Sequence, residues 1–177
     1  DDITLFEKCR VEDEVEVEIV DLKAALDVVQ LPKCASEEFT LDGSRSSSGP
    51  QINYEWSSSG GTITSISGNK AKGRGQGTYI LKVTYTNGNV ICEEEAEIQI
   101  DVSDDLIGDL TSSGIANCSH DTVYLAIYVL NGSGLYSYKW GPTKEIVGGQ
   151  NTDTAKVINA GRYSVTVTDL SSGCELY

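Results

Sequence analysis

Apolar and polar residues alternate along several short stretches of this chain, and glycine, serine and asparagine separate these stretches. Tyr79, Leu81, Val83 and Tyr85 occupy every second position of one such stretch, with Lys82 and Thr84 on the opposite face. Residues 96–102 and 163–167 show the same alternation, and Val123, Leu125, Ile127 and Val129 supply the apolar side of a further core strand. A period of two places all the apolar side chains on one face of a β-strand. The pattern therefore predicts strands that are buried on one face.

The stretch from Leu22 to Val29 is compatible with a helix by composition alone. Its neighbours alternate, however, and it runs into Leu31-Pro32, where the proline disfavours helical dihedral angles in the residue before it. We therefore expect a strand or an extended linker here. The many Val, Ile, Tyr and Thr residues favour an all-β chain as a whole.

The chain contains the same pattern twice. Matching residues are separated by the same number of positions as Cys34 and Cys118, and we call this spacing the repeat offset. The other pairs at this offset are Tyr54 and Tyr138, Trp56 and Trp140, Gly77 and Gly161, Tyr79 and Tyr163, and Val83 and Val167, while Cys92 and Cys174 match at a slightly shorter spacing. A repeat of this length is a whole domain, because solenoid units are much shorter. We predict two tandem β-sandwich domains, at residues 21–103 and 104–177, with both tryptophans packed in the cores.

The two ends of the chain are out of phase with these domains. Cys9 is followed by an alternating stretch, as Cys92 is, so residues 1–20 resemble the closing strand of a preceding repeat. Only three residues follow Cys174, and the second domain is predicted to lack its own closing strand. Either the chain is a slice of a longer array, or a neighbouring copy donates residues 11–20 to complete the sheet.

Four of the five cysteines occupy equivalent positions in the two copies. This predicts one disulfide in each domain, Cys34 with Cys92 and Cys118 with Cys174, while Cys9 is unpaired or bonded to another repeat. Disulfides indicate an oxidising compartment, and hence an extracellular or cell-surface location. Reduced thiols in a cytosolic protein are the alternative. A zinc site is disfavoured, because no two cysteines have the close spacing of such sites.

The formal charge of -14 makes nucleic acids and anionic membrane surfaces poor partners, because their phosphates would be repelled, and neither is expected. No run of about 18 apolar residues is present, so no membrane-spanning segment is expected. The N-terminus does not resemble a signal peptide, which is expected of a piece of a mature exported protein.

The sequence offers little catalytic chemistry. The single histidine, His120, is expected in a surface loop, and the serine clusters have no partner base. The chain is therefore predicted not to be an enzyme. Calcium is the one cofactor considered, because four aspartates gather between the domains, with a charged linker as the alternative. These are Asp101, Asp104, Asp105 and Asp109.

Parts of both copies resemble a known family. In the first copy the similar segments are residues 39–44, 54–56, 60–63 and 77–84, and in the second they are residues 136–140, 160–169 and 173–174. The first copy resembles PKD-like immunoglobulin-type repeats of large Bacteroidetes surface proteins, and the second resembles a short repeat of gliding-motility adhesins. The Trp-x-Phe-Gly-Asp-Gly segment of many PKD domains is absent, and Trp56 to Gly60 stands in its place. The resemblance implies β-sandwich modules that serve as spacers or adhesive stalks.

The second copy also has an excess of tyrosine. Tyr124 and Tyr128 lie on the face opposite the apolar side of their strand, which is expected to be covered on both sides, and Tyr136 is nearby. These side chains could pack against a neighbouring domain, which we favour, or stack on sugar rings. Glycosylation candidates are Asn131, in an Asn-Gly-Ser sequence, and Thr122 and Thr154, whose sequences resemble the Bacteroidetes O-glycosylation motif.

We therefore expect a non-enzymatic extracellular repeat that forms part of a stalk, fibre or filament of a surface adhesin. Its expected partners are neighbouring repeats, or copies of itself arranged head to tail. The alternative is a carbohydrate-binding or adhesive module of a secreted or surface protein, with glycans or surface proteins as partners.

Overall fold

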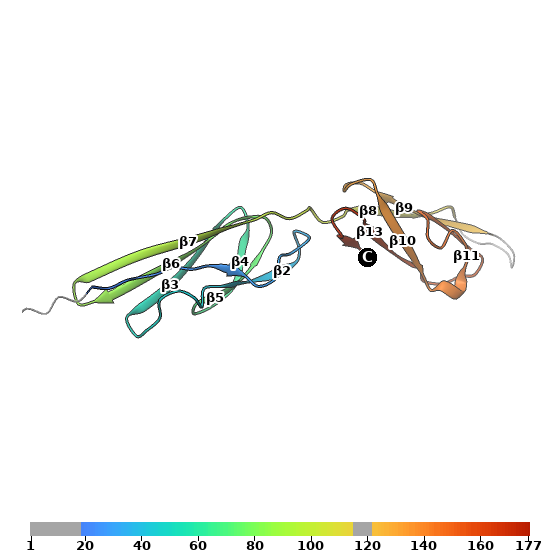
Figure 1. Cartoon of the computed structure of the whole chain (residues 1–177). Helices are drawn as coiled ribbons and strands as arrows, with labels where there is room; N and C mark the ends of the chain where they lie inside the picture. The colour runs from blue at the N-terminus through green and yellow to red at the C-terminus, as the bar shows by residue number, and fades with distance from the viewer. Residues whose placement is uncertain (1–18, 115–121) are drawn as a thin grey trace, which may run out of the picture.

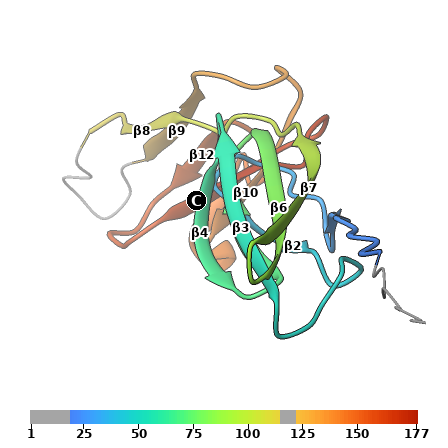
Figure 2. The same cartoon turned by 90° about the vertical axis from the view of Figure 1, so that its left-hand side faces the viewer.

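The computed structural model describes residues 19–114 and 122–177. Its regular elements are β-strands, apart from a three-residue 3-10 helix at Thr143–Glu145. The strands form two β-sandwiches that lie end to end, and the C-terminus lies at the end of the second sandwich that faces the first (Figure 1). In the view along the long axis the two sandwiches overlap (Figure 2). The predicted all-β class and the tandem arrangement are confirmed.

The first sandwich has seven antiparallel strands. They are β1 (Asp27–Val28), β2 (Glu38–Asp42), β3 (Ile52–Ser59), β4 (Thr62–Ser67), β5 (Lys70–Arg74), β6 (Gly77–Asn87) and β7 (Val90–Ile100). One sheet has the order β1-β2-β5-β4 and the other the order β3-β6-β7. This is the arrangement of a constant-type immunoglobulin domain, in which strands A, B, E and D face strands C, F and G.

The second sandwich repeats this topology. Its strands are β8 (Gly108–Ser112), β9 (Val123–Val129), β10 (Tyr136–Gly141), β11 (Ile146–Gly148), β12 (Thr154–Val157), β13 (Ser164–Asp169) and β14 (Glu175–Leu176). The sheet orders are β8-β9-β12-β11 and β10-β13-β14. Both domains are therefore immunoglobulin-like. The predicted absence of a closing strand needs one correction, because the two residues of β14 pair with Val167 and Thr168 and begin that strand.

The alternating stretches form the strands that they predicted. Tyr79, Leu81 and Val83 on β6 are fully buried, and Val165 and Val167 on β13 are their counterparts in the second core. Regular alternation matters here because each sheet has one face against the core and one against solvent.

The two tryptophans occupy equivalent sites. Trp140 is buried in the second core and its indole N–H donates to the carbonyl of Thr152, at 2.8 Å. Trp56 packs against the first core and donates to the carbonyl of Gly68, at 3.0 Å. Both acceptors lie 12 residues after their tryptophan. The predicted packing role is thus confirmed.

The predicted disulfide pairing is wrong. Cys34 is bonded to Cys174, 140 residues away in the other sandwich, and Cys92 is a free thiol. The reason is the direction of the strands: Cys34 forms a bridge with Ser103, just after the end of β7, whereas Cys92 lies near the start of β7. Ser103 follows Cys92 by 11 positions of extended chain, a distance of roughly 35 Å. The Cys118–Cys174 bond is also excluded, and Cys118 itself lies outside the described residues.

Two other predictions fall outside the described residues. They are the strand in residues 1–20, apart from its last two residues, and the surface position of His120.

Candidate functional site

The junction between the two sandwiches begins where the chain leaves β7. Ser103 lies parallel to Cys34 and forms an isolated β-bridge with it. The N–H of Ala35 donates to the Ser103 carbonyl at 2.9 Å, and the N–H of Ser103 donates to the Lys33 carbonyl at 3.1 Å. The linker is therefore fixed to the segment that precedes β2, rather than hanging free between the domains.

Hydrogen bonds also fix the linker to the second sandwich. The Asp105 carboxylate accepts from the N–H of Ser36, at 3.0 Å, on the first-domain side. The Asn131 side chain donates to the Asp105 carbonyl at 2.8 Å and accepts from the Ile107 N–H at 2.7 Å. Asp105 and its neighbours thus connect a loop of each domain.

The disulfide lies within the core of the second sandwich. Cys34 and Cys174 are both buried, with their Cα atoms 5.7 Å apart, and they cluster with Leu106, Trp140 and other apolar residues of the second domain. A residue of the first domain thereby contributes to the core of the second. Bending at the junction would have to disrupt this core, which makes the junction stiff.

Asp169 organises the hairpin that carries Cys174. Its buried carboxylate accepts from the N–H and hydroxyl of Ser133, at 2.6 and 2.8 Å, and from the N–H groups of Ser171 and Ser172, at 2.8 and 3.1 Å. The hydrogen bond from the Ser133 N–H is the largest cause that lowers the pKa of Asp169, and the other three donors lower it further. Burial acts in the opposite direction, and the resulting pKa of Asp169 is about 2. Asp169 is ionised at neutral pH and holds the loops around Cys174 together.

Glycine is required next to this carboxylate. Gly132 has a φ of +103°, and a Cβ at this position would lie 2.7 Å from the Asp169 carboxylate and 2.8 Å from the Leu106 side chain. Both the backbone conformation and the lack of space exclude a larger residue.

An open cleft of about 520 Å³ lies at the junction. Its lining includes Ser103, Asp104, Ser133 and Asp169. The Ser133 hydroxyl donates to Asp169, whose pKa of about 2 makes it a poor general base. Asp169 therefore does not activate the Ser133 hydroxyl as a nucleophile.

The predicted calcium ligands do not come together. Among residues 19–114 and 122–177, no group of three or more His, Cys, Asp or Glu side chains could hold a metal ion. Asp105 instead accepts from Ser36, and Asp101 accepts from the side chain of Gln99 at 3.1 Å. Asp104 lines the cleft, and Asp109 lies opposite Tyr128 in the sheet.

The three tyrosines do not form one platform. Tyr124 and Tyr128 lie on the outer face of β9 and are 49% and 60% exposed, so this face is not covered as predicted. Tyr136 instead packs against the core, with its ring edge-to-face to Tyr138, and its hydroxyl donates to the Asn131 carbonyl at 2.7 Å.

The structure places the glycosylation candidates at partly buried positions. Both polar atoms of the Asn131 amide are engaged at the junction, the nitrogen with the Asp105 carbonyl and the oxygen with the Ile107 N–H. Thr122 and Thr154 are half-buried, and Thr154 lies within β12.

Sequence reasoning missed the junction for identifiable reasons. It identified the paired cysteines but assumed that each pair is internal to a domain. The available signal was position: Cys34 precedes the second strand, whereas Cys92 and Cys174 lie near the start of the last one, and these points lie at opposite ends of an immunoglobulin-like sandwich. The Ser133–Asp169 contact gave no signal, because both residues are common in loops.

Comparisons with known proteins add similarity of fold only. No protein-family model matches the sequence, and no curated protein matches it. Murine CEACAM1b is 14% identical, with a TM-score of 0.34 over 86% of this chain and 96% of that one. An I-band fragment of titin is 11% identical, with a TM-score of 0.37 over 89% of this chain and 64% of that one. Mouse nectin-like molecule 4 is 13% identical, with a TM-score of 0.29 over 86% of this chain and 61% of that one.

The chain thus spans less than two thirds of the titin and nectin-like structures. Because all three TM-scores are low, the immunoglobulin-like assignment rests on the strand order of the two sandwiches. In the described part of the chain, no helix is long and apolar enough to cross a membrane.

Proposed function

We propose that this chain is a non-enzymatic structural segment of an extracellular stalk, fibre or filament, in which two immunoglobulin-like domains act as one stiff unit. The Cys34–Cys174 bond is the observation that carries this proposal, because it joins the domains covalently inside the core of the second one. Domains that need independent movement are usually joined by exposed linkers without such contacts.

The bond also changes how the chain bears load. When the chain is pulled from its two ends, force passes through the disulfide and bypasses residues 35–173. Without the bond, the 140-residue separation could release roughly 490 Å of chain, at about 3.5 Å per residue. The Cys34–Cys174 disulfide, which we call the staple, therefore limits extension under tension, as a stalk or spacer requires.

An oxidising location and an acidic surface fit this role. A structural disulfide persists outside the cytosol, and the charge of -14 keeps an extended molecule soluble and separate from its neighbours. Membership of a surface adhesin of the kind that the sequence resembles belongs to the same proposal.

Single-molecule force spectroscopy tests the role. With handles at both ends, the oxidised chain should release little contour length, whereas Cys34→Ser should release roughly 490 Å more. Cys92→Ser is the matched control, since it removes a thiol outside the staple and should behave as the unmodified chain. Equal extension of the oxidised chain and Cys34→Ser would overturn the proposed role.

An adhesive or carbohydrate-binding module is the second candidate, and the exposed Tyr124 and Tyr128 favour it. Tyrosine rings on one strand face can stack on sugar rings. Binding to a glycan array that is lost in Tyr124→Ala and Tyr128→Ala, but kept in Tyr136→Phe, would support this candidate. An array without signal for the unmodified chain would count against it.

A further inference from the structure

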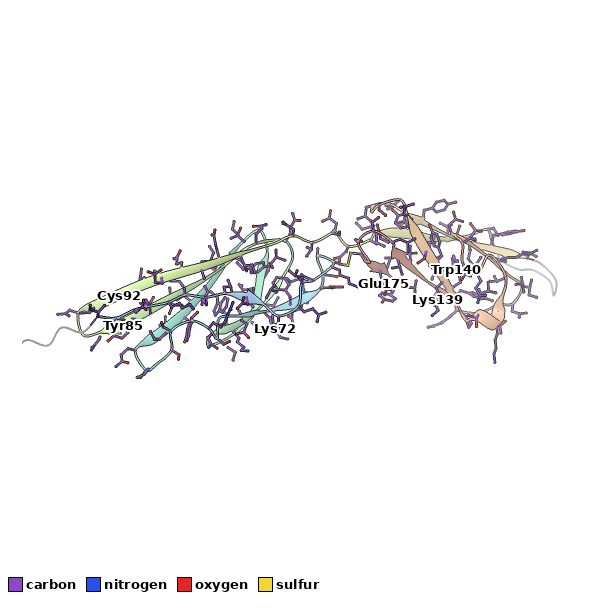
Figure 3. All side chains as sticks on the ribbon, in the orientation of Figure 1. Lys72, Tyr85, Cys92, Lys139, Trp140 and Glu175 are labelled. Atoms are coloured by element: carbon purple, nitrogen blue, oxygen red, sulfur yellow. A yellow bond between two sulfur atoms is a disulfide. The ribbon has the colours of Figure 1, made fainter. Side chains whose placement is uncertain are left out.

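We infer that Cys92 is the receiving half of a second interdomain disulfide, formed with the cysteine that a preceding immunoglobulin-like repeat carries just before its second strand. The inference rests on the proposed function, because it requires neighbouring repeats. Cys92 lies at the end of the first sandwich that faces away from the second (Figure 3).

Cys92 and Cys174 occupy the same place in their domains. Cys92 is opposite Tyr85 in the β6–β7 ladder. Cys174 is opposite Asp169, whose N–H donates to the Cys174 carbonyl at 2.9 Å. Tyr85 and Asp169 are separated by the repeat offset. The hairpin of the first domain is two residues longer, and this accounts for the shorter spacing between the two cysteines.

The contacts around the entering chain are repeated as well. Asp21-Leu22 precedes Asp105-Leu106 by the repeat offset. In the first domain the Lys23 N–H donates to the Ser47 hydroxyl at 2.9 Å. In the second domain the matching residues are Ile107 and Asn131, and the Ile107 N–H donates to the Asn131 side chain. The same pair of positions is therefore held in the same way at the start of each sandwich.

The matching ends of the first and second sandwiches differ in which residues cover them. In the second domain, Asp105 accepts from Ser36 and Leu106 is buried. In the first, Asp21 is exposed and Leu22 is only half-buried. Beside Cys92, Val90 and Ile91 are 55% and 64% exposed. Within residues 19–114 and 122–177, the first domain thus has the receiving residues of the junction but no segment that fills it as Cys34–Ser36 fill the second.

The occupant that fits is the counterpart of residues 33–36 in a preceding repeat. This segment supplies the cysteine and the N–H that the second domain receives from the first. Cys118, which matches Cys34 at the repeat offset, indicates that each repeat carries such a cysteine. The resulting array would have one covalent staple at every junction.

Formation of the bond is an oxidation of two thiols. One thiolate attacks oxidised glutathione and releases one reduced glutathione, and the second thiolate then displaces the other. The product is one disulfide and two reduced glutathione molecules, and the two thiol protons are transferred to the leaving thiolates or to water. The required oxidant is thus a small-molecule disulfide of the kind found in oxidising compartments.

The test uses two copies of the full chain as consecutive segments. The copies are mixed at millimolar concentration in a glutathione redox buffer. This concentration approximates the effective concentration that a short tether would give. Non-reducing peptide mapping should then find Cys92 of one copy joined to Cys118 of another. The link should be lost in Cys92→Ser and kept in Cys9→Ser. Asp21→Lys should slow its formation at least about tenfold, as loss of a charge-assisted contact predicts.

The map also separates the two proposals. Symmetric Cys92–Cys92 links, a Cys92–Cys9 bond, or Cys92 that ends as free thiol or glutathione adduct would overturn this inference. In each of these cases an intact Cys34–Cys174 peptide would leave the proposed function standing, whereas its absence would refute that function first.

Discussion

At the scale of single residues, the junction depends on groups that are buried and fully paired. Asp169 accepts four hydrogen bonds and lies beside Gly132, where a side chain cannot fit. Leu106 fills the space between the linker and the second core. Such residues tolerate substitution poorly, because a buried polar group that loses its partners keeps the cost of desolvation.

The Asp169 carboxylate should make the second sandwich sensitive to acid. Its folded pKa of about 2 lies below the ordinary value of 3.8. Its stabilising effect is therefore complete above about pH 4 and is lost as the pH falls towards 2. Asp169→Asn should lower the melting temperature at pH 7 and reduce the fall in melting temperature between pH 4 and 2. Fluorescence of Trp140 in a Trp56→Phe background reports on this domain alone, and an unchanged acid transition would contradict the prediction.

Two leucines of the same region give a matched pair. Leu106 is 6% exposed, whereas Leu110 on β8 is 51% exposed. Leu106→Ala should cost about 2–5 kcal/mol in the free energy of unfolding of the second sandwich, because it leaves a cavity. Leu110→Ala should cost under about 1 kcal/mol. Equal losses in denaturant titrations would show that Leu106 is not part of the core.

At the scale of elements, strand order explains what could be predicted. Alternation identified β6, β7 and β13, because a strand that is buried on one face has apolar residues at every second position, and the aliphatic residues at every second position of 123–129 identified β9. The repeat offset correctly indicated two copies of one fold. It could not indicate the partner of Cys34, since pairing across domains depends on which end of each sandwich meets the other. The position of the tyrosines was only partly predictable, because Tyr136 points to the core from a strand that the alternation did not reveal.

A charged side chain protects the edge strand β7 from pairing with another chain. Glu94 is opposite the buried Val83, on the same face as Ala96 and Ile98, yet it is exposed. A charge on the inner face of an edge strand opposes pairing with another chain. Glu94→Val should therefore self-associate in sedimentation velocity runs, whereas Glu97→Val, on the outer face, should remain monomeric. Monomers of both variants would argue against this role.

At the scale of the whole molecule, the staple makes two domains behave as one rod. The disulfide closes a 140-residue separation, and the chain-entropy model assigns about 5 kcal/mol to a loop of that size. The direct contacts at the junction add to this by fixing the orientation. The elongated shape in Figure 1 is therefore expected to persist in solution.

Reduction should loosen the rod without unfolding both domains. The Cys34→Ser, Cys174→Ser double variant should give small-angle X-ray scattering with a broader distribution of long distances than the oxidised chain. Cys92→Ser should scatter as the unmodified chain does. Identical curves for the double variant and the oxidised chain would mean that the noncovalent contacts alone set the shape.

Non-reducing peptide mapping of the oxidised chain by mass spectrometry tests the cross-domain staple most directly. We predict a linked pair of peptides that contain Cys34 and Cys174, and no peptide that joins Cys34 to Cys92. Bonds within each domain, Cys34 to Cys92 and Cys118 to Cys174, would contradict the stapled junction and the stiff unit built on it.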